Sequence, residues 1–444
     1  MTTGKVVSIH IKPDSMQNSQ GESQDKVFSI LKKINAIRES IEFLRNENLD
    51  TERIRDQYII HLQQCQEDHH ILKQIYKKLK FKIDSRSPDE QIVAESAMMQ
   101  NGVQNPQIDG QTLQPSFVQK PALIHAQISP TVKEYSQSPK VNIRLRYALN
   151  SSTVVCSAQF SNNGQIVAFA DGQNVYGVNY NDGELLFTYQ LPPTSSNNHH
   201  TRVLKFSPDD SLIALSGVDH DVFLIETQTG RLLHRFLLHS KEVNSIVFNQ
   251  DGSWMITSGF DGVIIVWDMK TFQAIKNLDH SEIGPDPTIV GIAPASDCSF
   301  YAVAFVCGIV GVYDESFSQA MVQFATQQRA LMGINVSPLD DSIATASNDN
   351  IVKIWMLRAV AKLKAELAGH LDVVLTAEFA PNDNLVFTGS KDMKIMIWNQ
   401  KNGQPLLEIE PHKNTIFQID HHPTKKSFVS CSGDGVVCVW DYDD

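Results

Sequence analysis

Histidine, a hydroxyl residue and aspartate recur at fixed distances from one another along the C-terminal part of the chain. An aspartate precedes a tryptophan by six residues in four places, and a serine or threonine lies four residues before each aspartate. Three of the aspartates also have a histidine 22 residues before them. The set is His239, Thr257, Asp261, Trp267, Thr345, Asp349, Trp355, His370, Thr388, Asp392, Trp398, His412, Ser430, Asp434 and Trp440. Histidine, hydroxyl and carboxylate are the groups of a hydrolytic triad, so nucleophilic catalysis is the first chemistry to consider.

The repetition and the tryptophan favour a structural network over catalysis. An aspartate in a tight turn between two strands must satisfy its carboxylate locally. The histidine, the hydroxyl and the indole N–H can bridge three strands to it. Each bond contributes ~0.5–1.5 kcal/mol net, whereas leaving the buried aspartate unpaired costs ~1–3 kcal/mol. We therefore interpret the set as structural, with the catalytic triad as the alternative.

The segments that carry these residues are copies of one unit. They read SGFDGVIIVWD at 258–268, ASNDNIVKIWM at 346–356, TGSKDMKIMIWN at 388–399 and CSGDGVVCVWD at 431–441. They resemble the repeat of the WD-repeat family, in which each unit is one blade of a propeller. The resemblance implies an all-β fold for the chain after residue 140.

Strand patterns predict seven blades between residues 141 and 444, at intervals of roughly 40 residues. Their first strands are expected at 154–160, 202–206, 243–248, 288–292, 331–336, 373–379 and 415–419. The last unit ends after its third strand, and the alternating segment 143–149 is expected to supply the fourth and close the ring. The tryptophan position holds Ile225 in the second unit and Tyr313 in the fourth, so these blades lack part of the network.

The N-terminal part has a different pattern. Residues 1–25 are polar and predict a disordered arm. Residues 26–83 follow an unbroken heptad pattern without Gly or Pro, which predicts an α-helical coiled coil that forms an oligomer. Asn48 and Arg55 make its centre polar, and a turn near 46–51 is the alternative to one long helix. Residues 84–140 are rich in Pro, Gln and Ser and predict a flexible linker.

Charge and cysteine usage narrow the class of protein. The chain of 444 residues has a net charge of −12, and residues 141–444 hold 20 Lys and Arg against 33 Asp and Glu. An acidic domain is a poor direct ligand for nucleic acid. Six cysteines without a CxxC pair predict free thiols in a reducing compartment. The sequence has no apolar run that is long enough to span a membrane. It also has no nucleotide-binding loop and no metal-ligand spacing, so no cofactor is predicted.

The mouth of the propeller channel is the candidate binding site. One position of each first strand should line it, and these residues are Cys156, Arg202, Asn244, Thr288, Met332, Leu375 and Phe417. Neighbouring turns and loops add Phe260, Asn348, Lys391 and Asn414. This mixture of apolar, amide and basic side chains, with no carboxylate pair, suits an inserted peptide segment. The alternative is that some of these residues only fill the channel.

Two longer segments carry a closer resemblance. TVVCSAQFSNNGQIVAFA at 153–170 and the stretch 369–416 resemble blades of the Tup/Groucho-type general transcriptional corepressors. That resemblance implies a non-enzymatic nuclear scaffold whose helices form a homo-oligomer, a tetramer in preference, and bind a tetratricopeptide-repeat subunit. Its propeller would bind sequence-specific DNA-binding repressors, and the assembly would engage histones or deacetylases. The alternative is another coiled-coil WD-repeat adaptor, in autophagy, ubiquitin ligation or splicing.

Overall fold

The computed structural model of the protein describes residues 124–443, except for 126–127, 136–140, 152, 173, 192–200, 218–219, 319 and 358–359. The predicted arm at 1–25, the predicted coiled coil at 26–83 and the first part of the predicted linker lie outside the described residues. Among the described residues, no helix is long and apolar enough to span a membrane.

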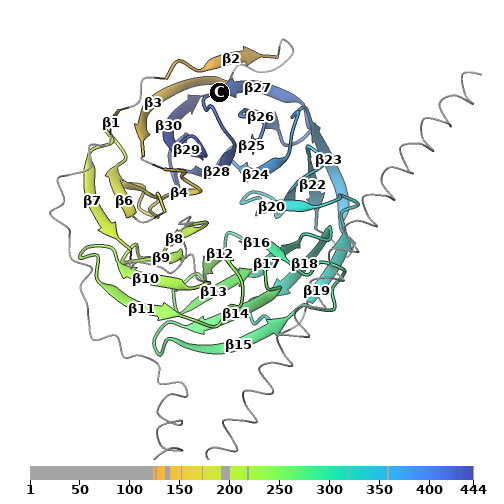
Figure 1. The fold of residues 1–444 in the computed structure, drawn as a ribbon. Coiled ribbons are helices and arrows are strands. Elements are labelled where there is room, and N and C mark those ends of the chain that lie inside the picture. Colours follow the sequence, from red (N-terminus) through yellow and green to blue (C-terminus); the bar gives the residue numbers. More distant parts are fainter. Residues whose placement is uncertain are drawn as a thin grey trace, which may run out of the picture. The chain divides into compact units, whose positions relative to one another are not determined.

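The described residues form seven sheets arranged around a common centre, which is a seven-bladed all-β propeller (Figure 1). In each blade the strands are hydrogen-bonded side by side and antiparallel, and the first strand of each unit lies nearest the centre. The first three blades consist of β4 (Ser157–Phe160), β5 (Ile166–Ala170), β6 (Asn174–Asn179) and β7 (Leu185–Gln190); β8 (Leu204–Phe206), β9 (Leu212–Ser216), β10 (Val222–Glu226) and β11 (Leu232–Phe236); and β12 (Val243–Phe248), β13 (Trp254–Gly259), β14 (Val263–Asp268) and β15 (Gln273–Asp279).

Blades 4 to 7 repeat this arrangement. They consist of β16 (Ile289–Pro294), β17 (Phe300–Phe305), β18 (Ile309–Asp314) and β19 (Ala320–Ala325); β20 (Leu331–Val336), β21 (Ile343–Ser347), β22 (Ile351–Met356) and β23 (Lys362–Ala368); β24 (Val374–Phe379), β25 (Leu385–Ser390), β26 (Ile395–Asn399) and β27 (Pro405–Glu410); and β28 (Ile416–His421), β29 (Ser427–Ser432), β30 (Val436–Asp443) and β3 (Asn142–Asn150). The last blade therefore joins strands from the two ends of the propeller sequence.

The predicted closure of the ring by residues 143–149 is observed. β3 pairs antiparallel with β30 from Asn142↔Asp443 to Asn150↔Val436. Arg146 reinforces the pair, because its guanidinium lies 2.9 Å from the Asp441 carboxylate. Pairing removes the free edge that β30 would otherwise expose.

Part of the segment predicted as a flexible linker is instead ordered on the propeller rim. β2 (Thr131–Glu134) pairs with β27 and gives blade 6 a fifth strand. β1 (Ile124–His125) pairs with β3 in blade 7. The side chains of β2 are exposed, so its backbone pairing holds it, together with the adjacent Tyr135, which contacts Glu408 and packs against the core between blades 5 and 6. A strand without a buried face leaves no hydrophobic pattern in the sequence, so the prediction of a linker at 84–140 is wrong here.

The core consists of apolar layers between neighbouring blades. The described part of the chain contains seven clusters of buried residues, and each joins the facing sides of two blades. Each sheet is therefore buried on both faces, which explains near-continuous apolar strands such as β14, VIIVWD. Because every layer is shared, no blade can bury its apolar faces alone.

The inner strands carry β-bulges at one level of the channel. In blades 3 to 7 the ladder skips one residue between the first and second strands, and these residues are Asn244, Val290, Met332, Leu375 and Phe417. A bulged residue is left out of the ladder pairing, and the bulge can re-aim its side chain. In blades 1 and 2 the equivalent residues, Cys156 and Arg202, come just before the ladder begins.

Candidate functional site

Blades 3 and 6 contain the complete histidine network. Nδ1 of His370 lies 2.9 Å from the Asp392 carboxylate, and its Nε2 lies 2.7 Å from the Thr388 hydroxyl oxygen. The Trp398 indole donates to that same hydroxyl at 2.8 Å. Blade 3 repeats these contacts. Nδ1 of His239 lies 2.9 Å from Asp261, and its Nε2 lies 2.8 Å from the Thr257 hydroxyl oxygen. The Trp267 indole donates to that hydroxyl at 2.9 Å.

This network has the hydrogen-bond direction of a catalytic triad but not its accessibility. The carboxylate requires a proton on Nδ1 of His370, so Nε2 accepts from the Thr388 hydroxyl. The hydroxyl of Thr388 is fully buried, however, and its acceptor site is occupied by the indole N–H of Trp398. No substrate can approach such an oxygen without unfolding the blade. The geometry therefore supports a structural role.

Blade 7 contains the same four residue types with a longer histidine contact. Nε2 of His412 lies 2.9 Å from the Ser430 hydroxyl, and the Trp440 indole donates to that hydroxyl at 3.1 Å. Nδ1 of His412 lies 3.4 Å from Asp434, and two backbone N–H groups, at 2.7 and 2.9 Å, complete the surroundings of this carboxylate. Burial opposes its ionisation, but His412 and the two N–H groups outweigh burial and lower the pKa of Asp434 to about 2.

Blade 5 replaces the histidine with a glutamine that the sequence analysis missed. The Gln328 carbonyl oxygen accepts from the Thr345 hydroxyl at 2.6 Å, and its amide nitrogen lies 3.5 Å from Asp349. The Trp355 indole donates to Thr345 at 3.1 Å. Gln328 lies 21 residues before the aspartate rather than 22, so the histidine spacing could not find it.

Blade 4 has a tyrosine at the tryptophan position, and blade 1 has a tyrosine nearby that bonds its aspartate. In blade 4, Nε2 of His280 lies 2.7 Å from the Tyr313 hydroxyl, and Cys307 replaces the aspartate. In blade 1, the Tyr176 hydroxyl donates to Asp171 at 2.9 Å. These six blades therefore each keep some polar link, although the residue types differ.

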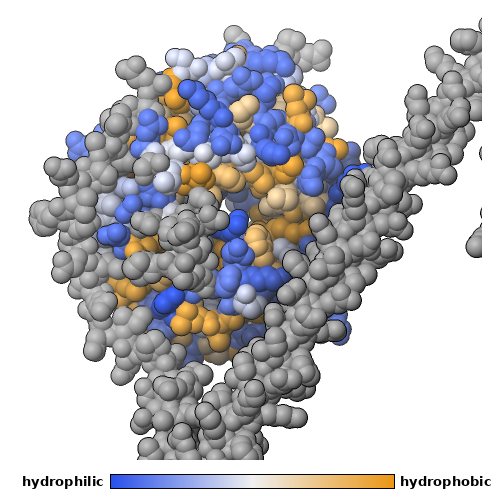
Figure 2. Space-filling model, viewed as in Figure 1, coloured by the Kyte–Doolittle hydropathy of each residue, from blue (hydrophilic) through white to orange (hydrophobic). Residues whose placement is uncertain are grey.

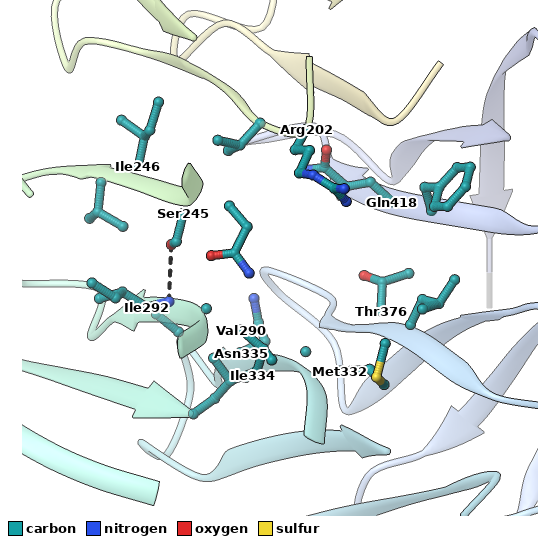
Figure 3. Close-up of a pocket in the computed structure, with 18 of the residues that line it drawn as sticks. Arg202, Ser245, Ile246, Val290, Ile292, Met332, Ile334, Asn335, Thr376 and Gln418 are labelled. Atoms are coloured by element: carbon teal, nitrogen blue, oxygen red, sulfur yellow. Dashed lines mark hydrogen bonds between the residues drawn. The ribbon is translucent and has the colours of Figure 1, made fainter. Parts of the chain in front are cut away.

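A cavity of about 580 Å³ occupies the centre of the ring and opens at its mouth (Figure 2). Six of the seven residues predicted to line the mouth do line it: Cys156, Arg202, Asn244, Met332, Leu375 and Phe417. They come from six different blades, so the cavity is a product of the whole ring. Figure 3 shows Arg202, which precedes β8, and Met332 and Asn335, which both belong to β20, around the same open space.

The prediction that Thr288 is the seventh residue of the mouth is wrong. Val290 lines the cavity and occupies the bulge position of blade 4, whereas Thr288 lies two residues earlier and bonds the Phe260 carbonyl oxygen at 3.3 Å. β16 begins at Ile289, one residue later than predicted, and ends at Pro294, two residues later than predicted. The lining residue was counted back from the predicted end of the strand, so it fell two residues too early. The correction makes the mouth more apolar.

The residues predicted from the turns and loops divide into two groups. Phe260 lines the cavity, and the Arg202 guanidinium lies over its ring, 5.1 Å from the ring centroid. Asn348, Lys391 and Asn414 are not among the residues that line the cavity. Lys391 forms a long ion pair with Asp372 at 3.7 Å. These three side chains are therefore not part of the cavity wall.

Deeper in the cavity lies a polar tier that the sequence analysis missed. It contains Gln159, Lys205, Asn335, Glu378 and Asp420, which lie three residues after the bulge position in their strands. The expectation of no carboxylate pair concerned the mouth residues alone and does not extend to this tier. Counting three residues on from each mouth residue would have found the tier, because both positions line the same channel.

The two carboxyl groups of this tier have raised pKa values. Burial, followed by the nearby charge of Asp420, raises the pKa of Glu378 to about 8. Burial also raises the pKa of Asp420 to about 6, although Lys205 opposes that change. Asp420 accepts from the Phe160 backbone N–H at 2.8 Å, and Glu378 contacts the Asn335 amide. Part of their role is thus to satisfy neighbouring inner strands.

The described residues contain no cluster of three or more His, Cys, Asp or Glu side chains that could hold a metal ion. Cys156, Cys298, Cys307, Cys431 and Cys438 are free thiols. The fold and the cavity together define a propeller with an open central site lined by seven blades.

Comparison with known proteins places this fold in a class. The model of the WD domain, G-beta repeat, matches residues 230–268, 322–356, 361–399 and 403–441, which are the units that end at the four tryptophans of the network. Four of the seven blades are therefore built around WD repeats.

Several curated proteins are similar to the chain at low identity. The COMPASS component SWD3 of Saccharomyces cerevisiae is 25% identical over 314 residues, which cover 64% of this chain and 93% of that protein. The target of rapamycin complex subunit wat1 of Schizosaccharomyces pombe is 24% identical over 249 residues, or 54% of this chain and 64% of wat1. The apoptotic protease-activating factor 1 of Rattus norvegicus is 26% identical over 236 residues, or 51% of this chain and only 18% of that protein. Their similarity supports the WD-repeat assignment and nothing finer.

Proposed function

We propose that the protein is a transcriptional corepressor scaffold whose propeller binds partner peptides at the channel mouth. The observation that carries the proposal is the open cavity bordered by apolar residues, among them Met332, Leu375 and Phe417, which the β-bulges leave outside the ladder. An apolar side chain inserted there would be desolvated on all sides, which is the environment of binding hot spots.

Two further observations support the nuclear and chromatin part of the proposal. The segments 153–170 and 369–416 resemble Tup/Groucho-type corepressors, and one similar protein is a COMPASS component by name. In this proposal the partners are DNA-bound repressors, a tetratricopeptide-repeat subunit, and histones or deacetylases, all in the nucleus. No reaction is catalysed. A TOR complex subunit is also similar, so a scaffold for another complex is the competing function.

A charge placed at the mouth should separate binding from folding. Leu375→Glu in the full chain should lose the co-purifying partners, because a carboxylate in the apolar border must be desolvated when a peptide covers it. Leu186→Glu is the matched control, because Leu186 is 52% exposed on the outer strand β7. Affinity purification with quantitative mass spectrometry compares both variants with the wild type. Equal partner recovery by all three proteins would contradict a role for the mouth, and partners unrelated to transcription would favour the competing scaffold.

The predicted coiled coil, which lies outside the described residues, has its own test. Ile41→Asp combined with Leu44→Asp places two charges in the heptad seam and should dissociate the oligomer to single chains, as measured by light scattering. Partner binding by the propeller should persist. Repression of a reporter with clustered sites should fall, because several mouths on one assembly gain from effective concentration. An unchanged mass would show that this seam does not hold the oligomer.

A further inference from the structure

Among the described strands, the outer rim of the propeller has two capped edges and five free ones. β1 covers blade 7 and β2 covers blade 6, and both join their neighbours antiparallel. In blades 1 to 5 the sheets end at β7, β11, β15, β19 and β23, and no described strand pairs with their outer edges. A free edge presents unpaired N–H and C=O groups that can pair with another chain, so the side chains on it decide what can approach.

Charged residues protect most of these free edges. The strands β11, β15 and β23 each contain at least one lysine or arginine. β7 is uncharged, but Glu184 lies directly before it. β19 reads AMVQFA, and the charged residues nearest to it, Glu315 and Arg329, lie five residues before it and four after it. Lysine and other charges are what normally keep an edge from pairing, so blade 4 has the least protected edge.

β19 also exposes an apolar side chain at a bulge. Its residues alternate between half-buried and exposed, and Met321 is 55% exposed. The ladder with β18 skips Met321, as the ladder of blade 6 skips Leu406 in the equivalent place. Leu406 is only 5% exposed and belongs to a core cluster against which Ile128, in the segment before β2, packs. The same apolar position is thus covered where the chain adds a strand and uncovered in blade 4.

The backbone of β19 can form a symmetric ladder with a copy of itself. The Thr326 N–H donates to the Gly308 carbonyl oxygen at 2.9 Å, so it points towards β18. Backbone groups alternate in direction along a strand, so those of Gln323 point away from β18. Two antiparallel copies of β19 with Gln323 opposite Gln323 would bond through these groups. Val322 of one copy would then lie opposite Phe324 of the other, and such apolar cross-strand pairs stabilise sheets.

We propose that β19 pairs with β19 of a second copy of the chain in the same assembly. An edge without charge can face itself, because no like charges meet. A pairing of six residues is small beside the ~1,200–2,000 Å² of a stable interface. It therefore favours a copy that is already tethered over a protein that must bind from solution. As the predicted linker, residues 84–123 would span roughly 35 Å, which lets two propellers on one coiled coil meet edge to edge.

The pairing would fix how two channel mouths face. Antiparallel pairing of identical strands creates a two-fold axis perpendicular to the joined sheets. This axis turns the second propeller over, so the two mouths open in opposite directions. An assembly joined in this way would present binding sites on both of its sides.

Disulfide trapping in the full chain tests the pairing. Gln323→Cys should link two copies, because the Cα atoms of directly opposite residues lie about 5.5 Å apart, within the range of a disulfide. Gln273→Cys is the matched control, because Gln273 is exposed on the outer strand β15 of blade 3. Both variants also carry Cys65→Ser, which removes the cysteine of the predicted coiled coil. In a buffer of oxidised and reduced glutathione, non-reducing electrophoresis should show roughly tenfold more covalent dimer for Gln323→Cys, and dilution of the protein should not lower this yield.

A charge on the edge gives a second test. Met321→Lys, added to Gln323→Cys, should lower the dimer yield to that of Gln273→Cys, because an edge lysine blocks pairing. Ile275→Lys is its control, because Ile275 is the skipped residue of β15 and is 45% exposed. Unchanged melting curves would show that both lysine variants are folded. Equal yields for the two cysteine variants, or a yield that Met321→Lys does not lower, would overturn the proposal. Equal yields with a loss of other proteins from Met321→Lys would assign the edge to a different partner and overturn it too.

Discussion

A chain that lacks residues 142–149 should not form a stable propeller. The deletion removes β3 from its long pairing with β30 and removes Tyr147 and Leu149 from the core between blades 7 and 1. Each large apolar side chain contributes ~1.5–3 kcal/mol when buried. A propeller stability of ~5–15 kcal/mol cannot absorb two such losses together with seven broken ladder positions. The newly exposed edge of β30 would also pair with other chains.

The measurement is solubility and thermal unfolding followed by circular dichroism on the full chain. Deletion of residues 128–135 is the control. It also removes a rim strand, but the side chains of β2 are exposed and its pairing covers only four positions. We expect a cooperative transition, slightly lowered, for the control and none for the 142–149 deletion. Similar melting curves for the two deletions would contradict closure as the source of stability.

Asp392→Ala should destabilise the propeller by about 2–4 kcal/mol, which is the cost of unpairing buried polar groups. The substitution leaves Nδ1 of His370 without its acceptor in a buried site, and it also frees the backbone N–H groups of Leu371 and Lys394. Both of the latter bonds lie at about 3 Å in the structure. The loss of the carboxylate also affects the Thr388 hydroxyl, because this hydroxyl bonds to Nε2 of His370.

Urea unfolding compares this variant with Asp251→Ala. Asp251 bonds the neighbouring Ser253 in an exposed turn and should cost little. Gln328→Ala in blade 5 should fall between the two, because the amide contact with Asp349 is long at 3.5 Å. If Asp392→Ala unfolds at the same urea concentration as Asp251→Ala, the network does not stabilise the fold.

The features that repeat in the sequence were the predictable ones. Fixed spacing revealed the network of Asp261 and Asp392, because each residue type recurs with the strand period of a blade. The same logic failed where one blade departs from the others. Gln328 performs the role of histidine one residue out of place, and the end of β16 at Pro294 shifted the mouth residue from Thr288 to Val290.

One other feature could not be predicted from patterns. β2 has no apolar face, so only its backbone pairing with β27 reveals it. The carboxyl pair Glu378 and Asp420 was missed for a different reason. The two residues occupy the same position in units 42 residues apart, and closure of the ring brings both into one cavity, but only the mouth positions of the units were compared.

The bulges at the channel mouth also bear on how such a protein can diversify. Met332 and Leu375 lie in the inner strands, yet the ladder skips both of them. Replacing such a residue changes the recognition surface without breaking a cross-strand pair. The seven mouth positions can therefore vary as an independent combinatorial code, while the buried layers between blades stay fixed. Duplicated genes could thus acquire new partners through a few substitutions, with little loss of foldability.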